Sequence, residues 1–169
     1  MVFPYKHEPL TNFLNPADRR EFKAALKKVR CELGKEYPLI INGKRIFTEE
    51  KLTSVNPANK VQVVGKVSKA TKEHIDQAFE AAKESFKKWR TMSPEARANV
   101  LFKAAAITRG KKHEISAWLV YDAGKPWRQA DADTAEGIDF LEYYGRQMLE
   151  LAKNQEMNNR PNEHNIYFY

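Results

Sequence analysis

The chain has 169 residues, of which 42% are hydrophobic and 11% aromatic, so it can bury one core but cannot hold two full-sized domains. Its 29 basic and 22 acidic residues give a formal net charge of +7, but the two signs are interleaved, which is typical of solvated helix faces rather than of a nucleic-acid-binding block. The longest stretch without Asp, Glu, Lys or Arg, residues 9–17, is polar, whereas a membrane-spanning helix needs about 20 apolar residues, so we expect neither a nucleic acid nor a membrane as partner.

The first predicted element is a helix from Pro16 to Leu33. Asn15 is a good N-cap and proline fits the first helical position, while Gly34 is a typical stop. Apolar residues recur at helical spacing along it, and Cys31 falls off this stripe. We expect Cys31 to be a partly buried small residue, because no base lies near it in the sequence.

A β-hairpin is predicted over residues 38–47. Its centre, Asn42–Gly43, suits a turn that needs positive φ at both central positions. Residues 56–59 predict another turn, and residues 61–67 predict a third strand rich in β-branched side chains. Together these segments predict a small antiparallel sheet.

From residue 71 onward the periodicity predicts four amphipathic helices, at about 71–89, 94–110, 112–123 and 126–152. Their expected inward residues are Ile75, Ala78, Phe79, Ala82, Phe86 and Trp89; Val100, Leu101, Ala104 and Ile107; Ile115, Trp118 and Leu119; and Ala130, Thr134, Gly137, Ile138, Leu141, Tyr144, Met148 and Leu151. Gly137 and Gly145 each cost a helix about 1 kcal/mol relative to alanine, so we expect both to mark close packing. The chain ends in an aromatic run, residues 165–169, that predicts a strand without a partner.

Several classes of site are not expected. The seven glycines are at least eight residues apart, so no glycine-rich phosphate loop is present, and no Gly-x-Ser-x-Gly motif occurs. The histidines lack metal-ligand spacing, so no metal site is expected. Charged residues within the first ten positions, where a secretion signal needs an apolar run, favour a cytoplasmic protein.

The order and spacing of several motifs resemble the N-terminal part of the aldehyde dehydrogenase superfamily. The motifs are Ile41–Gly43, Ser54–Ala58, Ala78–Trp89, Arg97–Leu101 and Ala123–Pro126. Within that superfamily, three further runs look like the 1-pyrroline-5-carboxylate dehydrogenase branch, namely Val63–Ala70, Ala130–Glu136 and Ile138–Tyr144.

This resemblance implies an α+β, helix-rich fold: the N-terminal part of an aldehyde-dehydrogenase-like α/β fold with a small antiparallel sheet, lacking the parallel Rossmann core. It divides the chain into an N-terminal helical extension (1–37), a partial nucleotide-binding domain (38–152) and the start of an oligomerisation or bridging segment (153–169). It implies a homo-oligomeric, NAD-dependent enzyme that oxidises glutamate semialdehyde to glutamate in proline degradation. The family's catalytic Asn, Glu and Cys have no counterpart here, so we expect a truncated chain that is inactive alone.

The resemblance also places one residue near the substrate. Glu136 matches a helix carboxylate of the 1-pyrroline-5-carboxylate branch, and a negative charge suits the ammonium group of an amino-acid semialdehyde. The sequence alone favours a solvated or helix-dipole residue at Glu136, and the resemblance makes the two interpretations equal. Two other functions remain open: a scaffold that associates with intact homologous subunits, and a basic nucleic-acid binder, which the charge pattern disfavours.

Overall fold

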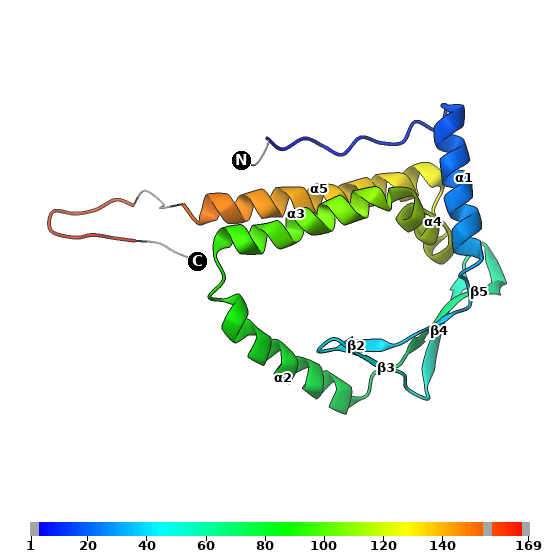
Figure 1. Ribbon diagram of the computed structural model, residues 1–169, viewed down its shortest axis with the longest axis horizontal. Helices are drawn as coiled ribbons and strands as arrows, with labels where there is room; N and C mark the ends of the chain where they lie inside the picture. Colours follow the sequence, from blue (N-terminus) through cyan, green and yellow to red (C-terminus); the bar gives the residue numbers. More distant parts are fainter. Residues whose placement is uncertain (1–3, 154–156, 167–169) are drawn as a thin grey trace.

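The computed structural model describes residues 4–153 and 157–166, and it is helix-rich with two small sheets (Figure 1). The helices are α1 (Pro16–Arg30), α2 (Lys72–Trp89), α3 (Pro94–Gly110), α4 (Lys112–Ala123) and α5 (Trp127–Leu151). The strands are β1 (Glu36–Tyr37), β2 (Leu39–Ile41), β3 (Lys44–Ile46), β4 (Lys51–Asn56) and β5 (Asn59–Ser68). The helix-rich α+β class predicted from the sequence is confirmed.

The start of α1 follows the predicted chemistry. The Asn15 side chain accepts a hydrogen bond from the Ala17 N–H at 2.9 Å, and Pro16 occupies the first turn. The helix ends at Arg30, three residues before the predicted end, and the chain continues through turns to Gly34, whose φ is +80°. Cys31 caps this end and is exposed, so the prediction of a partly buried side chain was wrong.

The hairpin is confirmed, but the sheet differs from the prediction. β2 pairs antiparallel with β3 around Asn42 and Gly43, whose φ values are 50° and 73°, and this pair forms a sheet of its own. The other sheet has the order β1-β5-β4, in which β1 is parallel to β5 and β4 is antiparallel to it. The single antiparallel sheet was therefore wrong, because a two-residue strand such as β1 is too short to give a sequence period.

Strand β4 was also missed, because its polar sequence gives no strong β signal. It forms through its pairing with β5 across the predicted turn at residues 57–58. The buried Asn56 side chain stabilises this turn, accepting from the Ala58 N–H at 2.9 Å and donating to the Gln62 Oε1 at 2.8 Å.

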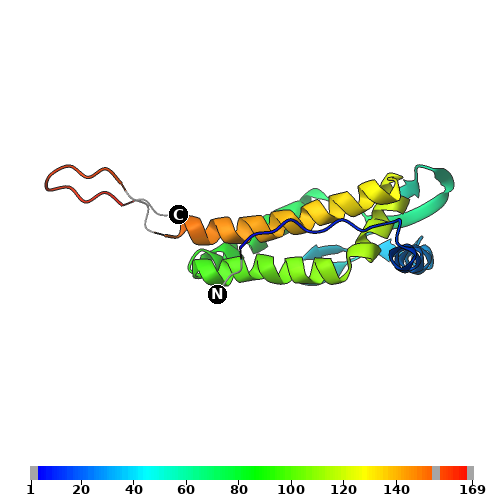
Figure 2. The same cartoon turned by 90° about the horizontal axis from the view of Figure 1, so that it is seen from above.

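The core lies between α3, α4 and α5. Figures 1 and 2 show α3 and α5 side by side along most of their lengths. Small residues allow this close approach: Ala98 and Ala105 of α3 are buried, and Gly145 of α5 lies against the Phe102 ring, which a Cβ on Gly145 would meet at 2.5 Å. Gly145 therefore marks close packing as predicted. Gly137 does not, because it is exposed and its Cβ would meet nothing within 4 Å.

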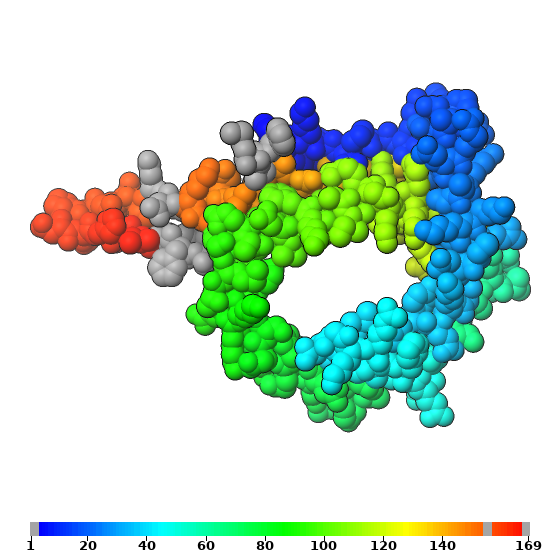
Figure 3. Space-filling model, in the orientation of Figure 1, coloured from blue at the N-terminus to red at the C-terminus, as the bar shows by residue number. Residues whose placement is uncertain are grey.

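Several predicted inward faces are exposed instead. Val100 and Ile107 of α3 and Tyr144 of α5 are about half exposed, and α2 buries none of its residues. Figure 3 shows the reason, since α2, α3 and the strands surround an opening through the molecule. Periodicity identified the apolar stripes, but it does not say whether the described chain itself supplies the surface that covers them.

The C-terminal residues 157–166 extend away from the body and are exposed (Figures 1 and 2). No strand is assigned among them, and the rest of the predicted aromatic strand, residues 167–169, lies outside the described residues. No helix in the described part of the chain has the length and apolar character needed to cross a membrane.

The two glycines of α5 give a paired test of the packing. Gly137→Ala should raise the free energy of unfolding by about 1 kcal/mol, because alanine favours the helix and meets open space. Gly145→Ala should lower it by about 1 kcal/mol, because the clash with the Phe102 ring outweighs the same helical gain. Urea unfolding of the two variants checks this, and equal stabilisation by both would contradict the close α3–α5 contact.

Candidate functional site

Helix α5 presents three faces to its surroundings. One face packs on α3 and α4 through Thr134, Ile138 and Gly145, all buried. The second face contacts residues 4–14, which we call the N-terminal strap and which run alongside α5 (Figure 1). The third face is free, and it carries Glu136.

The free face combines a carboxylate with aromatic rings. Glu136, Phe140 and Tyr144 follow at four-residue intervals, so they lie in one row along the helix. All three are exposed, and the rings of Phe140 and Tyr144 stack with centroids 6.0 Å apart and an interplanar angle of 20°. Glu136 has no hydrogen bond or ion pair among the described residues. Its carboxylate is therefore free to bind a cation or a donor.

A buried acidic residue ties the strap to two helices. Asp131 is 1% exposed and accepts hydrogen bonds from the Thr11 N–H at 2.8 Å and the Thr11 hydroxyl at 2.6 Å. The Lys112 ammonium of α4 lies 3.2 Å from the same carboxylate and donates to the Pro9 carbonyl at 2.7 Å. The sequence gives no signal that Asp131 is buried, because its partners come from elements far away in the chain.

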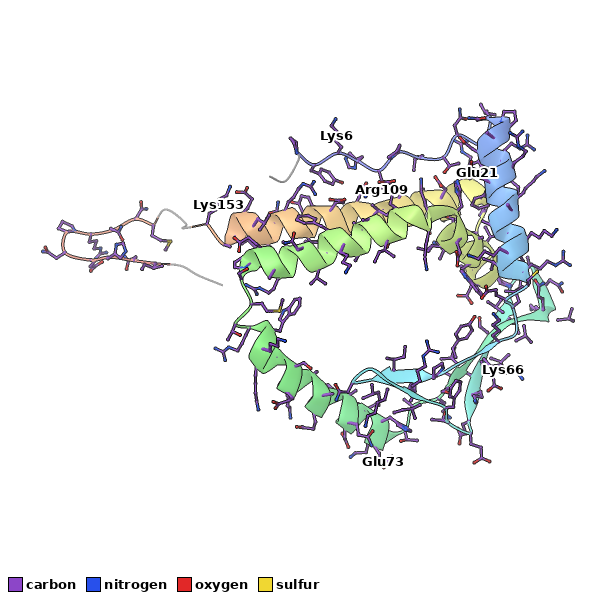
Figure 4. All side chains as sticks on the ribbon, in the orientation of Figure 1. Lys6, Glu21, Lys66, Glu73, Arg109 and Lys153 are labelled. Carbon is purple, nitrogen blue, oxygen red and sulfur yellow. The ribbon has the colours of Figure 1, made fainter. Side chains whose placement is uncertain are left out.

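A second group of charges fixes the strap about two helical turns further along α5. The Asp139 carboxylate accepts from the Glu8 N–H at 2.7 Å and lies 3.0 Å from His7 Nδ1. Arg109 of α3 then joins the strap to α5, because it donates to Glu8 at 2.7 Å and to Glu142 at 3.0 Å. Figure 4 shows Arg109 on the side of α3 that faces the strap.

These contacts change how the two carboxylates of α5 titrate. Desolvation acts to raise the pKa of Asp139, but the hydrogen bonds from His7 and the Glu8 N–H, with the charge of His7, outweigh it and hold the pKa below its ordinary value. The pKa of Glu142 is also lowered, since the hydrogen bonds and charges of Arg146 and Arg109 exceed the opposing desolvation. Both carboxylates therefore favour the folded state in their ionised form.

An aromatic cluster fixes α1 on the same helical body. The Phe22 ring is buried and packs edge-on against Phe13 at 5.1 Å and against His113 of α4 at 5.7 Å between centroids. Trp127, at the start of α5, lies 5.0 Å from Phe22. This cluster, together with the strap contacts, positions the N-terminal helix without covering Glu136.

The remaining described residues show no further reactive cluster. No group of three or more His, Cys, Asp or Glu side chains able to hold a metal occurs in the described ranges. Cys31, which caps the C-terminal end of α1, is exposed, and no base or cation among the described residues marks it as a nucleophile.

Residues 46–169 match the Aldehyde dehydrogenase family. The chain belongs to the aldehyde dehydrogenase family. Over all of its 169 residues it is 62% identical to the 1-pyrroline-5-carboxylate dehydrogenases of Oceanobacillus iheyensis and Geobacillus thermodenitrificans, and it covers 33% of each. The superfamily and branch indicated by the sequence motifs are confirmed.

The solved structures agree with this relationship. The 1-pyrroline-5-carboxylate dehydrogenase from Thermus with bound NAD matches 99% of this chain with a TM-score of 0.94 and 42% sequence identity. The chain covers 33% of that structure. This chain therefore spans about a third of the length of the relatives it matches, and it corresponds to their N-terminal part.

The lowered pKa of Asp139 predicts how the strap responds to acid. A depressed carboxylate stabilises the folded state above its unfolded pKa of about 3.9, and this contribution is lost as the pH falls through the lower folded value. Wild type should therefore exceed Asp139→Asn in unfolding free energy at pH 5, and the difference should shrink as the pH falls below about 4.

Urea unfolding between these pH values measures the difference. Glu84→Gln is the control, since Glu84 forms an exposed ion pair with Lys87 on α2, and such pairs contribute little. A difference between wild type and Asp139→Asn that stays constant with pH would show that the Asp139 contacts do not depend on its charge.

Proposed function

We propose that this chain forms the N-terminal part of an NAD-dependent dehydrogenase that oxidises glutamate semialdehyde, the open form of 1-pyrroline-5-carboxylate, to glutamate. The observation that carries the proposal is the match of the entire chain, at 62% identity, to 1-pyrroline-5-carboxylate dehydrogenases. The TM-score of 0.94 with the Thermus enzyme supports the same assignment at the level of structure. We place this enzyme in the cytoplasm, in the pathway that degrades proline to glutamate. We further propose that it is a homo-oligomer.

The exposed apolar surface supports the idea that further chain is needed. Large apolar side chains stay exposed on the elements that surround the opening, including Phe79, Phe86 and Trp89 of α2 and Val100 and Ile107 of α3. Surfaces of this kind are normally covered. We assign the covering role to the remaining two-thirds of such an enzyme, which would supply the parallel Rossmann core. Residues 1–37 are then an extension, 38–152 part of the nucleotide-binding domain, and 153–169 the start of a bridging segment.

The residues of this chain do not fit an NAD site by themselves. A phosphate-binding loop brings several glycines together at one helix N-terminus. Here the glycines with positive φ, Gly34, Gly43 and Gly124, belong to separate turns. Accordingly, no catalytic step is assigned to residues of this chain. Binding of the nucleotide and the chemistry on the aldehyde belong to parts of the enzyme beyond it.

Glu136 is the residue of this chain that we place at the substrate. It has an exposed carboxylate with no partner among the described residues, and it lies on the free face of α5, in a row with Phe140 and Tyr144. A carboxylate pairs well with the ammonium group of an amino-acid semialdehyde, and charge-assisted bonds of this kind contribute about 1.5–3 kcal/mol. A solvated Glu136 without a substrate role is the alternative.

A second candidate function follows from the same apolar surface. This surface equally suits a scaffold that associates with intact homologous subunits through α2, α3 and the strands. Light scattering separates the two functions, because a scaffold should form mixed oligomers with the full-length enzyme, whereas a compact, non-associating monomer would exclude it.

The chain assayed alone should show no turnover. We expect purified residues 1–169, mixed with glutamate semialdehyde and NAD, to give no NADH absorbance above a protein-free blank, since none of its residues carries the reaction. The full-length Thermus enzyme is the positive control. A rate above the blank would refute the assignment of the chemistry to other parts of the enzyme.

The role of Glu136 is tested in the full-length protein that contains this chain. Glu136→Gln should lower kcat/KM for glutamate semialdehyde about 10- to 100-fold, because the ammonium group loses its charged partner. The effect on an aldehyde of the same length without an amino group should be much smaller. Glu80→Gln, on the exposed face of α2, serves as control, and kinetics unchanged in Glu136→Gln would remove Glu136 from the site.

A further inference from the structure

One face of α1 collects the basic residues of that helix into a single exposed row. The helix carries six basic residues and only two acidic ones. At about 100° per residue, five of the basic residues fall within one sector of roughly 100°, and both acidic residues fall outside it. We call these five residues the basic stripe: Arg19, Arg20, Lys23, Lys27 and Arg30, all exposed.

The basic stripe is not neutralised by carboxylates of the described residues. None of its five side chains forms an ion pair or a side-chain hydrogen bond with another described residue. On α2, by contrast, Lys72, Lys83 and Lys87 each pair with a carboxylate of the same helix at 2.5–3.0 Å. The interleaved charges of α2 therefore form ion pairs within the helix, whereas the cations of the basic stripe on α1 do not.

The acidic residues of α1 are turned toward the protein. Glu21 lies 3.7 Å from His113 of α4, and Asp18 joins Glu21 in a groove of about 550 Å³ between α1, the strap and α4. Figure 4 shows Glu21 on the side of α1 that faces the rest of the molecule, with other side chains of the helix pointing outward. The fold itself thus separates the two signs of charge.

The location of the basic stripe keeps it accessible. The apolar side of α1, with Phe22 and Val29, is buried against the helical body, so the stripe faces outward. Helix α1 lies at one edge of the described part of the molecule (Figure 1).

We propose that the basic stripe docks an acidic helix of a partner protein. Arg19, Lys23 and Lys27 are four residues apart and Arg30 follows after three, which gives a row of cations spaced by about 4.5–6 Å along the axis. Carboxylates at positions i, i+4 and i+7 of a second helix have the same spacing. Arginine adds bidentate bonds to carboxylates, which fix the register of such a pair.

The composition and packing of α1 disfavour single-stranded nucleic acids and membrane surfaces. Single-stranded nucleic acids are bound by aromatic residues placed among the cations, and the stripe contains no aromatic residue. A membrane-surface helix inserts its apolar face into lipid, but that face of α1 is already buried in the protein.

The test measures binding of a defined acidic helix to the full chain. The probe is a fluorescent alanine-based peptide of about 20 residues with glutamate at every third or fourth position. Duplex DNA and vesicles of phosphatidylcholine with phosphatidylglycerol are compared at about 50 and about 200 mM salt. The stripe variant is Arg19→Gln/Lys23→Gln/Lys27→Gln, and the control is Lys72→Gln/Lys83→Gln/Lys87→Gln, which removes the same charge from α2.

We expect the peptide to bind at low salt, to weaken at high salt, and to bind the stripe variant about 10-fold more weakly. The control variant should bind within about 2-fold of wild type, since its lysines are already neutralised by neighbours. Circular dichroism shows that both variants keep their helices. Three results would each overturn the proposal: no peptide binding at low salt, equal losses in the two variants, or tighter binding of DNA or vesicles than of the peptide.

Discussion

The buried carboxylate of Asp131 is the interaction on which the described fold depends most. It accepts two hydrogen bonds from Thr11 of the strap and pairs with Lys112 at the start of α4, while it belongs to α5 itself. A buried charge is strongly unfavourable unless it is fully paired, and removal of one partner of such a pair costs about 3–5 kcal/mol. The strap, α4 and α5 therefore have one arrangement that satisfies all of these groups.

This constraint makes α5 the axis of the molecule and leaves one of its faces free. The strap covers one side through Asp131 and Asp139, and α3 packs on another through Gly145 and Phe102. The free side carries Glu136 and two stacked aromatic rings, and these side chains are exposed in the described part of the chain. Glu136 is the residue of this chain that our proposal assigns to the substrate.

The two outward-facing surfaces of the molecule differ in character. The surface around the opening is apolar, as expected of elements that cover a core contributed by other residues. The outward surface of α1 carries the basic stripe, whose five side chains form no ion pair with another described residue. The first surface belongs to the enzyme's own architecture, whereas the second is suited to recognition of a different molecule.

The sequence by itself determined the local structure and the family. Local structure depends on neighbouring residues, as in the Asn15 cap, the Asn42–Gly43 turn and the helical periods. The family motifs are recognised from their order and spacing along the chain, which need no tertiary structure. The tertiary structure alone decided which helix faces are covered, which glycine packs closely, and how β1 pairs with β5. It also decided that Asp131 is buried, whereas Glu136 and the five cations of the basic stripe have no ion pair among the described residues. These properties depend on contacts between residues distant in sequence, which no local pattern encodes.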